Sequence, residues 1–234
     1  MGRGRGDLQP LSRRPHAAHR LSNSAHRGCW VNRRLGLTQR VDEFPERCET
    51  RDALDQRWAG LLESLGFVPV PLCNQIQNTA VYLGALALDG IIITGGNDVA
   101  HASLAELPTR DRFEYGVLAY CRDRQIPVLG VCRGMQIINV FFKGRLSPLA
   151  GHVASRHRVT RGAQVRNVNS FHNFGIEAGD LGAGLIATGF CDDGSIEAMR
   201  HQSAPFHGLM WHPEREEPAE AMDVALIREI FGTA

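Results

Sequence analysis

The chain has 234 residues, of which 43% are hydrophobic and 22% charged, a composition typical of a globular protein with a substantial core. No uninterrupted apolar stretch reaches the length of a membrane span, so we expect no membrane partner. The 26 basic and 25 acidic side chains leave a net charge of +1, which gives no reason to expect a nucleic-acid partner.

The first 33 residues differ in composition from the rest of the chain. They contain seven arginines, three histidines and one acid, Asp7, with little hydrophobic periodicity. We predict that residues 1–33 form a disordered basic extension and that the domain spans residues 34–234. Two origins remain open: a mitochondrial-type transit peptide, which Pro10 and Pro15 disfavour, or upstream sequence translated in the gene model.

Strands and helices are predicted to alternate from residue 34 to residue 142. A strand over 34–40 is followed by a polar run, and a helix is predicted from Thr50 to Gly66 because its apolar side chains share one face. These side chains are Leu54, Trp58, Leu61, Leu62 and Leu65. Strands over 67–72 and 90–94 flank a helical turn over 81–87. The second strand is continuous and β-branched, which predicts a central, buried position.

The second half of this alternation leads to a short apolar strand. A helix is predicted around an apolar face formed by Phe113, Val117, Leu118 and Cys121. A strand over 126–131 and a helix over 133–142 follow. Strands that alternate with helices predict an α/β fold, with a flavodoxin-like, mostly parallel sheet and helices on both faces.

After Gly144 the pattern changes to short strands and turns. Residues 192–194, Asp-Asp-Gly, predict a hairpin between strands over 185–190 and 195–201. A strand over 206–211 and a closing helix over 219–231, ended by Gly232, complete the chain.

The six cysteines of the chain are scattered without any C-x-x-C pair. They lie at positions 29, 48, 73, 121, 132 and 191. A chain of this length does not need disulfides to stabilise its core. The cysteine pattern therefore favours a reducing, cytoplasmic location over secretion.

Cys132 lies between a predicted strand and a predicted helix, with Gly130 and Gly134 two residues to either side. The same arrangement around serine forms the nucleophile elbow of other hydrolases, in which small neighbours let the backbones pass. The thiol would lie at a helix N-terminus, where the dipole favours a thiolate. The N–H of Arg133 would supply one oxyanion donor. An ordinary buried cysteine remains the open alternative.

The loops after the strands over 90–94, 126–131 and 206–211 would meet at the carboxyl edge of a parallel sheet. A cysteine nucleophile needs a base within reach, and the base needs an orienting carboxylate. His212 and Glu214 fit these roles, because residues i and i+2 of an extended segment point the same way. A zinc site formed by Cys132, His212 and Glu214 is disfavoured because the chain lacks ligand pairs at zinc spacing, so no metal is expected.

The segments 130–136 (GVCRGMQ) and 211–214 (WHPE) together resemble the class I glutamine amidotransferase family, which includes the Cys-His-Glu γ-glutamyl hydrolases. The resemblance covers residues 34–234 and implies the class I glutamine amidotransferase fold. It also implies that Cys132 is the nucleophile, His212 the base and acid, and Glu214 the orienting carboxylate.

The same resemblance implies further site residues. The backbone N–H groups of Gly96 and Arg133 would form the oxyanion hole. The residues implied to bind the γ-glutamyl substrate are Gly95, Asn97, Gln136, Asn169, Ser170, Phe171 and His172. For Gln136 and for 169–173, an exposed polar surface without a substrate contact remains open.

Within this family the chain is most similar to the γ-glutamyl-CDP-amidate hydrolases of capsule phosphoramidate synthesis. The similarity is carried by residues 51–54, 94–98, 168–175, 195–198 and 210–216. Residues 143–166 contain six lysines or arginines and no acid, so Arg156 and Arg158 are predicted to bind a diphosphate through their planar guanidinium groups. A solvated basic loop remains the alternative.

The implied reaction is hydrolysis of a γ-glutamyl amide through an acyl-enzyme thioester, with no metal or organic cofactor. The favoured small-molecule substrate is γ-glutamyl-CDP-amidate, which would give glutamate and cytidine diphosphoramidate. One alternative is a glutaminase subunit that delivers ammonia to a synthase, a partner that the chain does not itself imply. Others are a γ-glutamyl-aminobutyrate, γ-glutamyl-polyamine or γ-glutamyl-peptide hydrolase, or a binding or regulatory protein with an inert fold.

Overall fold

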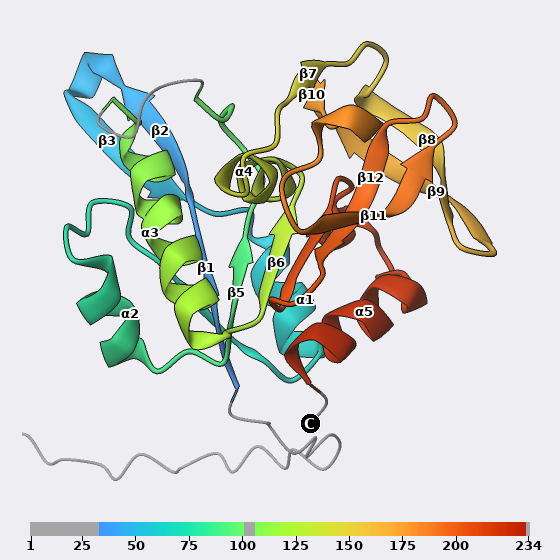
Figure 1. The fold of residues 1–234 in the computed structure, drawn as a ribbon. Helices are drawn as coiled ribbons and strands as arrows, with labels where there is room; N and C mark the ends of the chain where they lie inside the picture. The colour runs from blue at the N-terminus through green and yellow to red at the C-terminus, as the bar shows by residue number, and fades with distance from the viewer. Residues whose placement is uncertain (1–32, 101–105, 233–234) are drawn as a thin grey trace, which may run out of the picture.

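The computed structural model describes residues 33–100 and 106–232, so the predicted basic extension lies outside the described residues except for Arg33. The strands of the main sheet are β1 (Arg34–Leu37), β4 (Val68–Pro71), β5 (Gly90–Ile93), β6 (Val128–Val131), β8 (Val153–Arg161), β9 (Gln164–Phe171), β11 (Leu185–Cys191), β12 (Ile196–His201) and β13 (Phe206–Leu209). Their order across the sheet is β4-β1-β5-β6-β13-β12-β11-β8-β9 (Figure 1).

The sheet has a parallel half and an antiparallel half. β4, β1, β5, β6 and β13 pair in parallel, whereas β13, β12, β11, β8 and β9 pair antiparallel. Two short additional sheets pair β7 (Ser147–Pro148) with β10 (Phe174–Gly175), and β2 (Arg40–Phe44) with β3 (Glu49–Ala53).

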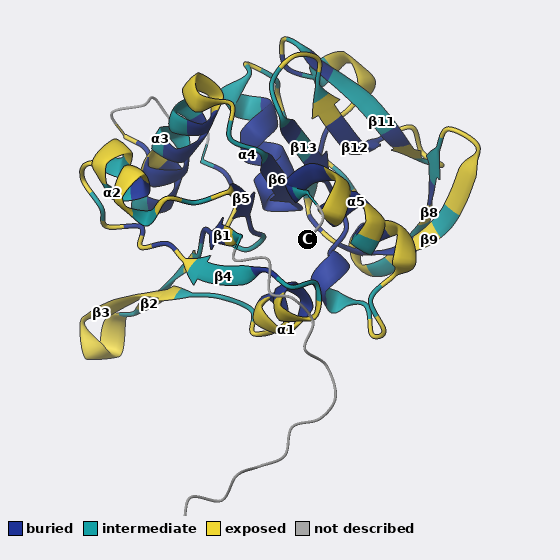
Figure 2. Cartoon of the chain, turned by 90° about the horizontal axis from the view of Figure 1, so that it is seen from below, coloured by how far each residue is buried: buried dark blue, intermediate teal, exposed yellow. Residues whose placement is uncertain are grey.

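Helices cover both faces of the sheet. α1 (Arg57–Ser64) and α5 (Ala221–Phe231) lie on one face, and α2 (Thr79–Leu86), α3 (Thr109–Arg124) and α4 (Arg133–Phe141) lie on the other (Figure 2). Short 3₁₀ turns lie at η1 (Pro45–Arg47), η2 (Ala178–Asp180) and η3 (Pro213–Arg215). The predicted flavodoxin-like α/β architecture is confirmed.

Residues of β5 show why the central strands are apolar throughout. Ile92 packs in the core beneath α1 and α5, whereas Ile91 and Ile93 pack in the core beneath α2, α3 and α4. Successive side chains of a strand point to opposite faces, so a strand covered on both sides has no polar face. This arrangement fixes the position of the loop that begins at Thr94.

The segment between β1 and α1 differs from the prediction. The predicted strand over 34–40 ends at Leu37, and the polar run forms a hairpin in which Arg40 pairs with Ala53. The predicted helix therefore begins at Arg57 and not at Thr50. The helical spacing of apolar side chains applies only from Trp58 onward. Residues 49–53 form a strand instead, because their backbone pairs with β2.

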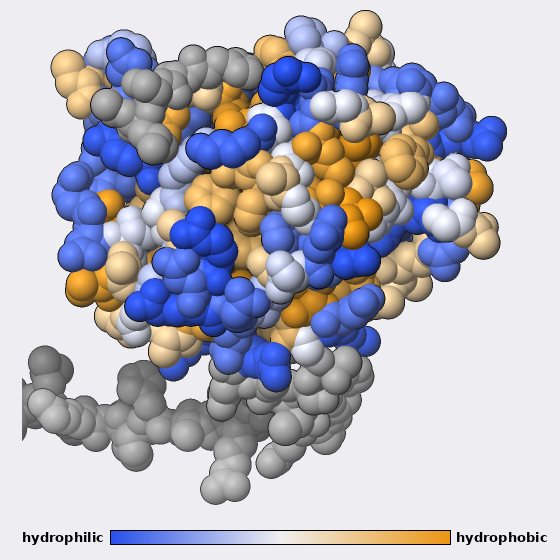
Figure 3. Space-filling model, viewed as in Figure 1, coloured by the Kyte–Doolittle hydropathy of each residue, from blue (hydrophilic) through white to orange (hydrophobic). Residues whose placement is uncertain are grey.

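The surface of the described residues is mixed in polarity. Hydrophilic side chains gather over the carboxyl-terminal end of α3, whose residues 122–124 are exposed (Figure 3). Among the described residues, no helix combines the length and the apolar character that crossing a bilayer requires.

Candidate active site

Cys132 lies at the junction of β6 and α4 in a strained backbone conformation, with φ of 54° and ψ of −109°. A Cβ atom on Gly130 would lie 2.4 Å from the carbonyl oxygen of Gly134, and one on Gly134 would lie 1.9 Å from that of Ile93. Both glycines are therefore required for the close backbone approach. The predicted elbow is present, and such strain is characteristic of catalytic nucleophiles.

His212 follows β13 in an extended conformation and is 2% exposed. Its Nδ1 lies 2.7 Å from Oε1 of Glu214, which is also buried. The backbone of His212 is held by Asn169, whose Oδ1 accepts from the His212 N–H at 3.0 Å and whose Nδ2 donates to the His212 carbonyl at 2.9 Å. Asn169, predicted as a substrate ligand, thus positions the imidazole.

Electrostatics connect Cys132, His212 and Glu214. Burial by itself lowers the pKa of His212, but hydrogen bonds to the Cys132 thiol and the Glu214 carboxylate outweigh burial and raise this pKa to about 9. The imidazole is therefore protonated at neutral pH. A protonated imidazole in contact with the Cys132 thiol can donate a proton to a leaving group bound there.

A cavity of about 240 Å³ opens beside Cys132. Of the predicted site residues, it is lined by Gly96, Asn97, Cys132, Arg133, Gln136, Phe171 and His172. Asn173, at the end of the predicted 169–173 stretch, also lines it, as does Asp98, which was not predicted as a site residue. The structure thus brings together three segments that are far apart in the sequence.

Gly96 and Arg133, the residues predicted to supply the oxyanion donors, both line this cavity. Arg133 is the first residue of α4, where a backbone N–H has no acceptor within the helix. Gly96 has a φ of +94°, and a Cβ atom there would lie 2.9 Å from Cβ of Arg40. Its neighbour Gly95 packs against the imidazole, because a Cβ on Gly95 would lie 2.8 Å from Cε1 of His212.

Other predicted residues lie outside the cavity wall. Ser170 is fully buried, and its hydroxyl donates to the carbonyl of His152 at 2.6 Å. Arg156 and Arg158 project from the exposed side of β8. Nη1 of Arg156 bonds Oε1 of Glu216 at 2.8 Å, and that oxygen also accepts from Asn169. Arg156 is thus linked to the His212 segment through two side chains.

Comparison with known proteins assigns the family. The family model described as Peptidase C26 matches residues 36–166 and 153–214. This chain belongs to the Peptidase C26 family, which is class I glutamine amidotransferase-like. It is 34% identical over 201 residues to the gamma-glutamyl-CDP-amidate hydrolase of Campylobacter jejuni, covering 84% of this chain and 96% of that protein.

Two further proteins are similar to this chain, one in sequence and one in fold. A putative glutamine amidotransferase-like protein of Lactococcus lactis is 31% identical over 208 residues, covering 75% of this chain and 86% of the relative. The crystal structure of a glutamine amidotransferase from Thermotoga maritima matches with a TM-score of 0.61 at 11% identity, covering 85% of this chain and 83% of the other. The latter likeness shows the shared fold alone.

A buried ionic network supports the site of this Peptidase C26 chain and was not predicted from its sequence. Arg133 pairs with both Asp111 and Glu114, and Arg110 pairs with Glu114 at 2.9 Å. Nη2 of Arg110 also donates to the Thr94 carbonyl at 2.8 Å. All four charged side chains are 3% exposed or less. The network therefore joins α3, the elbow and the loop that carries Gly96.

Arg110 and Glu114 of this network are charged at neutral pH. Burial raises the pKa of Glu114, but Arg110 and Arg133 outweigh burial, so the pKa lies below its usual value. Burial lowers the pKa of Arg110 to about 10, against the opposing effect of Glu114. Arg110 and Glu114 are four residues apart on the same buried face of α3 as Phe113 and Val117. This spacing of opposite charges on an apolar helix face is the sequence signal that could have revealed the ion pair.

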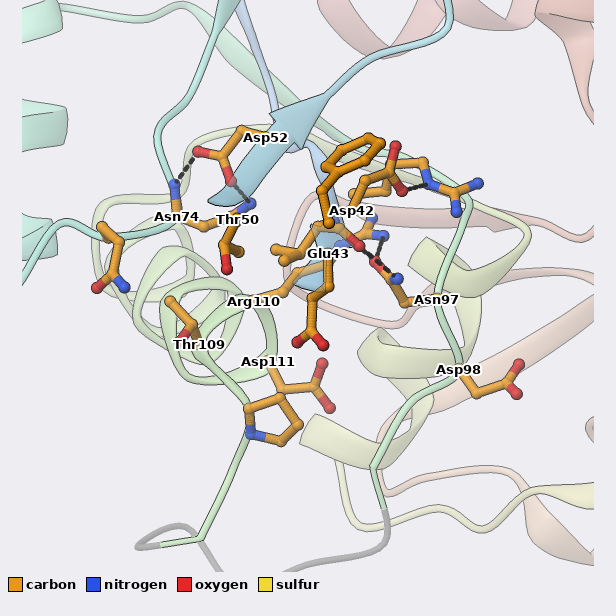
Figure 4. A pocket seen from close by; sticks show the side chains of 15 residues that line it. Asp42, Glu43, Thr50, Asp52, Asn74, Asn97, Asp98, Thr109, Arg110 and Asp111 are labelled. Atoms are coloured by element: carbon orange, nitrogen blue, oxygen red, sulfur yellow. Dashed lines mark hydrogen bonds and ion pairs between the residues drawn. The ribbon is translucent and has the colours of Figure 1, made fainter. Parts of the chain in front are cut away.

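A larger cavity of about 1050 Å³ adjoins the site and shares Asn97 and Asp98 with the cavity at Cys132. Figure 4 shows the β2–β3 hairpin on one side of it and the start of α3 on the other. Its charged lining residues are Arg40, Asp42, Glu43, Asp52, Asp98, Arg110 and Asp111. Because carboxylates outnumber guanidinium groups, this cavity is an unfavourable place for a diphosphate.

Proposed function

We propose that this Peptidase C26 chain is a cysteine hydrolase that cleaves γ-glutamyl amides, with Cys132 as nucleophile, His212 as proton carrier and Glu214 as its orienting carboxylate. The observation that carries the proposal is the strained Cys132 at the start of α4, in contact with an imidazole that Glu214 holds from its other side. A binding protein with an inert site has no need for this strain.

The proposed reaction has two halves. The Cys132 thiolate attacks the γ-carbonyl carbon, and the resulting oxyanion accepts from the N–H groups of Gly96 and Arg133. The amide C–N bond breaks as the His212 imidazolium protonates the departing nitrogen. His212, now neutral, takes a proton from water, which attacks the thioester and releases glutamate and the thiolate.

We propose γ-glutamyl-CDP-amidate as the favoured substrate, in which the amide nitrogen is bonded to phosphorus of CDP. Hydrolysis would give glutamate and cytidine diphosphoramidate, a step of capsule phosphoramidate synthesis. The similarity to the Campylobacter jejuni hydrolase supports this choice, since it extends over 96% of that protein. The basic outer side of β8, with Arg156 and Arg158, supplies positive charge for a diphosphate.

The acidic lining of the larger cavity favours a second candidate, a γ-glutamyl amide with a cationic leaving group such as a polyamine. A glutaminase subunit is a third, and it predicts weak activity on glutamine until a synthase is added.

A side-by-side assay separates these candidates. We expect kcat/KM for γ-glutamyl-CDP-amidate to exceed that for glutamine, γ-glutamyl-putrescine and γ-glutamyl-aminobutyrate by at least about 100-fold, because a diphosphate adds charge-assisted hydrogen bonds. A higher kcat/KM for γ-glutamyl-putrescine would indicate that the larger, acidic cavity binds the cationic leaving group. Equal activity on all four substrates would contradict a leaving-group site of any kind.

The pKa of His212 predicts the alkaline limit of activity. Because the imidazolium must protonate the leaving nitrogen, kcat/KM should fall above about pH 9. Replacing the carboxylate in Glu214→Gln removes a partner that raises this pKa, so the decline should begin at lower pH, with kcat reduced roughly 10²–10⁴-fold. The measurement is the pH profile of kcat/KM for both proteins. An unchanged alkaline limb in Glu214→Gln would contradict the assigned role.

The same ionisation should affect folding. The pKa of His212 in the folded protein lies above its ordinary value of about 6.5, so protonation of His212 stabilises the folded state. This stabilisation is fully present below about pH 6.5 and is lost as the pH rises through about 9. The free energy of unfolding should therefore decline over this range more steeply in the wild type than in Glu214→Gln.

The basic side of β8 predicts a selective change in binding. The double variant Arg156→Ala/Arg158→Ala should raise KM for γ-glutamyl-CDP-amidate at least about 10-fold and leave KM for glutamine unchanged, because only the first substrate carries a diphosphate. Glu216→Gln is the matched control, since it removes the ion pair of Arg156 and keeps the guanidinium. Equal KM changes for both substrates would contradict a diphosphate site there.

A further inference from the structure

Three histidines and one glutamate converge in the antiparallel half of the sheet, away from the Cys132 thiol. His152 precedes β8, His157 lies on β8, His172 follows β9, and Glu197 lies on β12. The side chains of His152, His172 and Glu197 are 5% exposed or less, and that of His157 is 14% exposed. No step of the proposed reaction uses this cluster of four side chains.

The polar atoms at the centre of the cluster have no hydrogen-bond partners among the described residues. These atoms are His152 Nδ1, His157 Nε2, His172 Nε2 and both carboxylate oxygens of Glu197. A buried carboxylate without a partner is costly, and buried polar groups in native proteins are almost always satisfied. Five unpartnered atoms that face one another therefore indicate that something is bound between them.

The separations fit a metal ion. Oε1 of Glu197 lies 3.8 Å from His152 Nδ1 and 3.6 Å from His172 Nε2, and Oε2 lies 3.2 Å from His157 Nε2. None of these contacts has hydrogen-bond geometry. Zinc–ligand bonds of about 2.0–2.1 Å in a tetrahedron place neighbouring ligand atoms roughly 3.4 Å apart. The three observed nitrogen–oxygen values lie on both sides of that distance, and the ligand atoms of His152, His172 and Glu197 all lie within 4.8 Å of one another.

In two of the imidazoles, the ring nitrogen that points away from the cluster has an oxygen partner that fixes the orientation of the ring. His152 Nε2 lies 2.8 Å from Oδ2 of Asp193, and His172 Nδ1 lies 3.0 Å from the carbonyl oxygen of Phe174. A carboxylate or carbonyl acceptor on the far nitrogen is the usual partner of a metal-ligating histidine, because it fixes the tautomer and directs the inner nitrogen at the ion.

We propose that His152, His157, His172 and Glu197 bind one divalent transition-metal ion, for which Zn²⁺ is the best match. The donor set of three imidazole nitrogens and one carboxylate oxygen suits Zn²⁺, and four protein ligands are typical of closed, structural sites. The ion would join β8, β9 and β12 behind the wall of the Cys132 cavity, which His172 also lines.

The alternative interpretation is a set of protonated imidazoles paired with Glu197. An ion pair of that kind would place ring nitrogens in hydrogen-bond geometry with the Glu197 oxygens. The nitrogens His152 Nδ1, His157 Nε2 and His172 Nε2 lie 3.2–3.8 Å from those oxygens without that geometry. These contacts are poor hydrogen-bonded ion pairs but suitable distances between two ligands of one metal ion.

A second combination of atoms can be tested directly. Sγ of Cys191 lies within 4.8 Å of ligand atoms of both His152 and His157. If the metal is bound by the three histidines and Glu197, the variant Cys191→Ser should retain it. If the metal is instead bound by His152, His157 and the Cys191 sulfur, Cys191→Ser should lose it.

The test is the metal content of the full-length protein, purified without chelator and measured by elemental mass spectrometry. We expect about one Zn²⁺ per chain. Chelation should lower the melting temperature, and added Zn²⁺ should restore it. Co²⁺ added to the stripped protein should give visible absorption bands of tetrahedral coordination. These readouts need no substrate, so they remain valid if the proposed hydrolase function fails.

Variants connect the metal to the cluster. Glu197→Gln and His157→Ala should each lower the bound Zn²⁺ at least about 10-fold, because each removes one ligand. His207→Ala is the matched control, since this half-buried histidine lies on β13 outside the cluster, and it should bind Zn²⁺ like the wild type. If either ligand variant does not fold, the wild-type measurements decide. A wild type that lacks a transition metal, melts equally with chelator and gives no Co²⁺ bands would overturn the proposal.

Discussion

Cys132→Ala is expected to lower kcat for γ-glutamyl amide hydrolysis by at least about 10⁴-fold, because it removes the sulfur atom that we propose forms the thioester. Steady-state turnover and intact-protein mass spectrometry with the most active substrate measure this loss. The wild type should show a transient glutamyl adduct and the variant none. Turnover near the wild-type rate would eliminate the proposed enzyme at its first step.

Two further variants show whether a loss of activity reflects chemistry or folding. Cys73→Ala removes an exposed thiol that follows β4 and should leave kcat unchanged. Cys132→Gly should be as inactive as Cys132→Ala but more stable, because glycine adopts a φ of 54° with little strain. We expect a difference in the free energy of unfolding of about 1 kcal/mol or more. Equal stabilities would show that the elbow is not strained.

The elbow could be predicted from sequence because its determinants are local. Gly130 and Gly134 are required by backbone contacts that a five-residue segment makes with itself and with the neighbouring strand. The β-branched run of β5 and the apolar run of β6 likewise reveal strands buried on both faces. Each of these features leaves a pattern within a few residues, and each agreed with the structure.

Other features depend on partners that are distant in sequence and therefore could not be predicted. Residues 49–53 carry no strong apolar alternation and form a strand only because β2 pairs with them. His157 and Glu197 are separated by 39 intervening residues, and nothing near either one indicates that both face the same point. Asn169 was named from resemblance as a substrate ligand, although its hydrogen bonds to the His212 backbone emerge only from the assembled sheet.

Glu114→Gln is expected to have the largest effect on stability, with a loss of about 3–5 kcal/mol in the free energy of unfolding. The Glu114 carboxylate pairs with two buried guanidinium groups. Among the described residues, its removal leaves Arg110 with no carboxylate partner and Arg133 with Asp111 as its remaining one. For a chain of this size, such a loss lowers the melting temperature by roughly 6–20 °C. Thermal unfolding followed by circular dichroism measures the change.

The pH dependence of stability separates the lost charge from a simple packing defect. Because the folded pKa of Glu114 is depressed, its contribution is present above the unfolded value of about 4.3 and is lost as pH falls below it. The stability difference between the wild type and Glu114→Gln should therefore shrink in acid, whereas a packing defect would be independent of pH. Glu63→Gln, at an exposed position of α1, is the matched control and should unfold like the wild type.

The same variant tests how the network acts on the site. Arg110 donates to the carbonyl of Thr94 and to Oδ1 of Asn97, so it holds the loop that carries Gly96, the proposed oxyanion donor. At a temperature where Glu114→Gln is fully folded, kcat should still fall while KM changes little, because an oxyanion donor acts mainly in the transition state. A folded variant with wild-type kcat would show that the loop keeps its position without the buried ion pairs, and that the network serves stability alone.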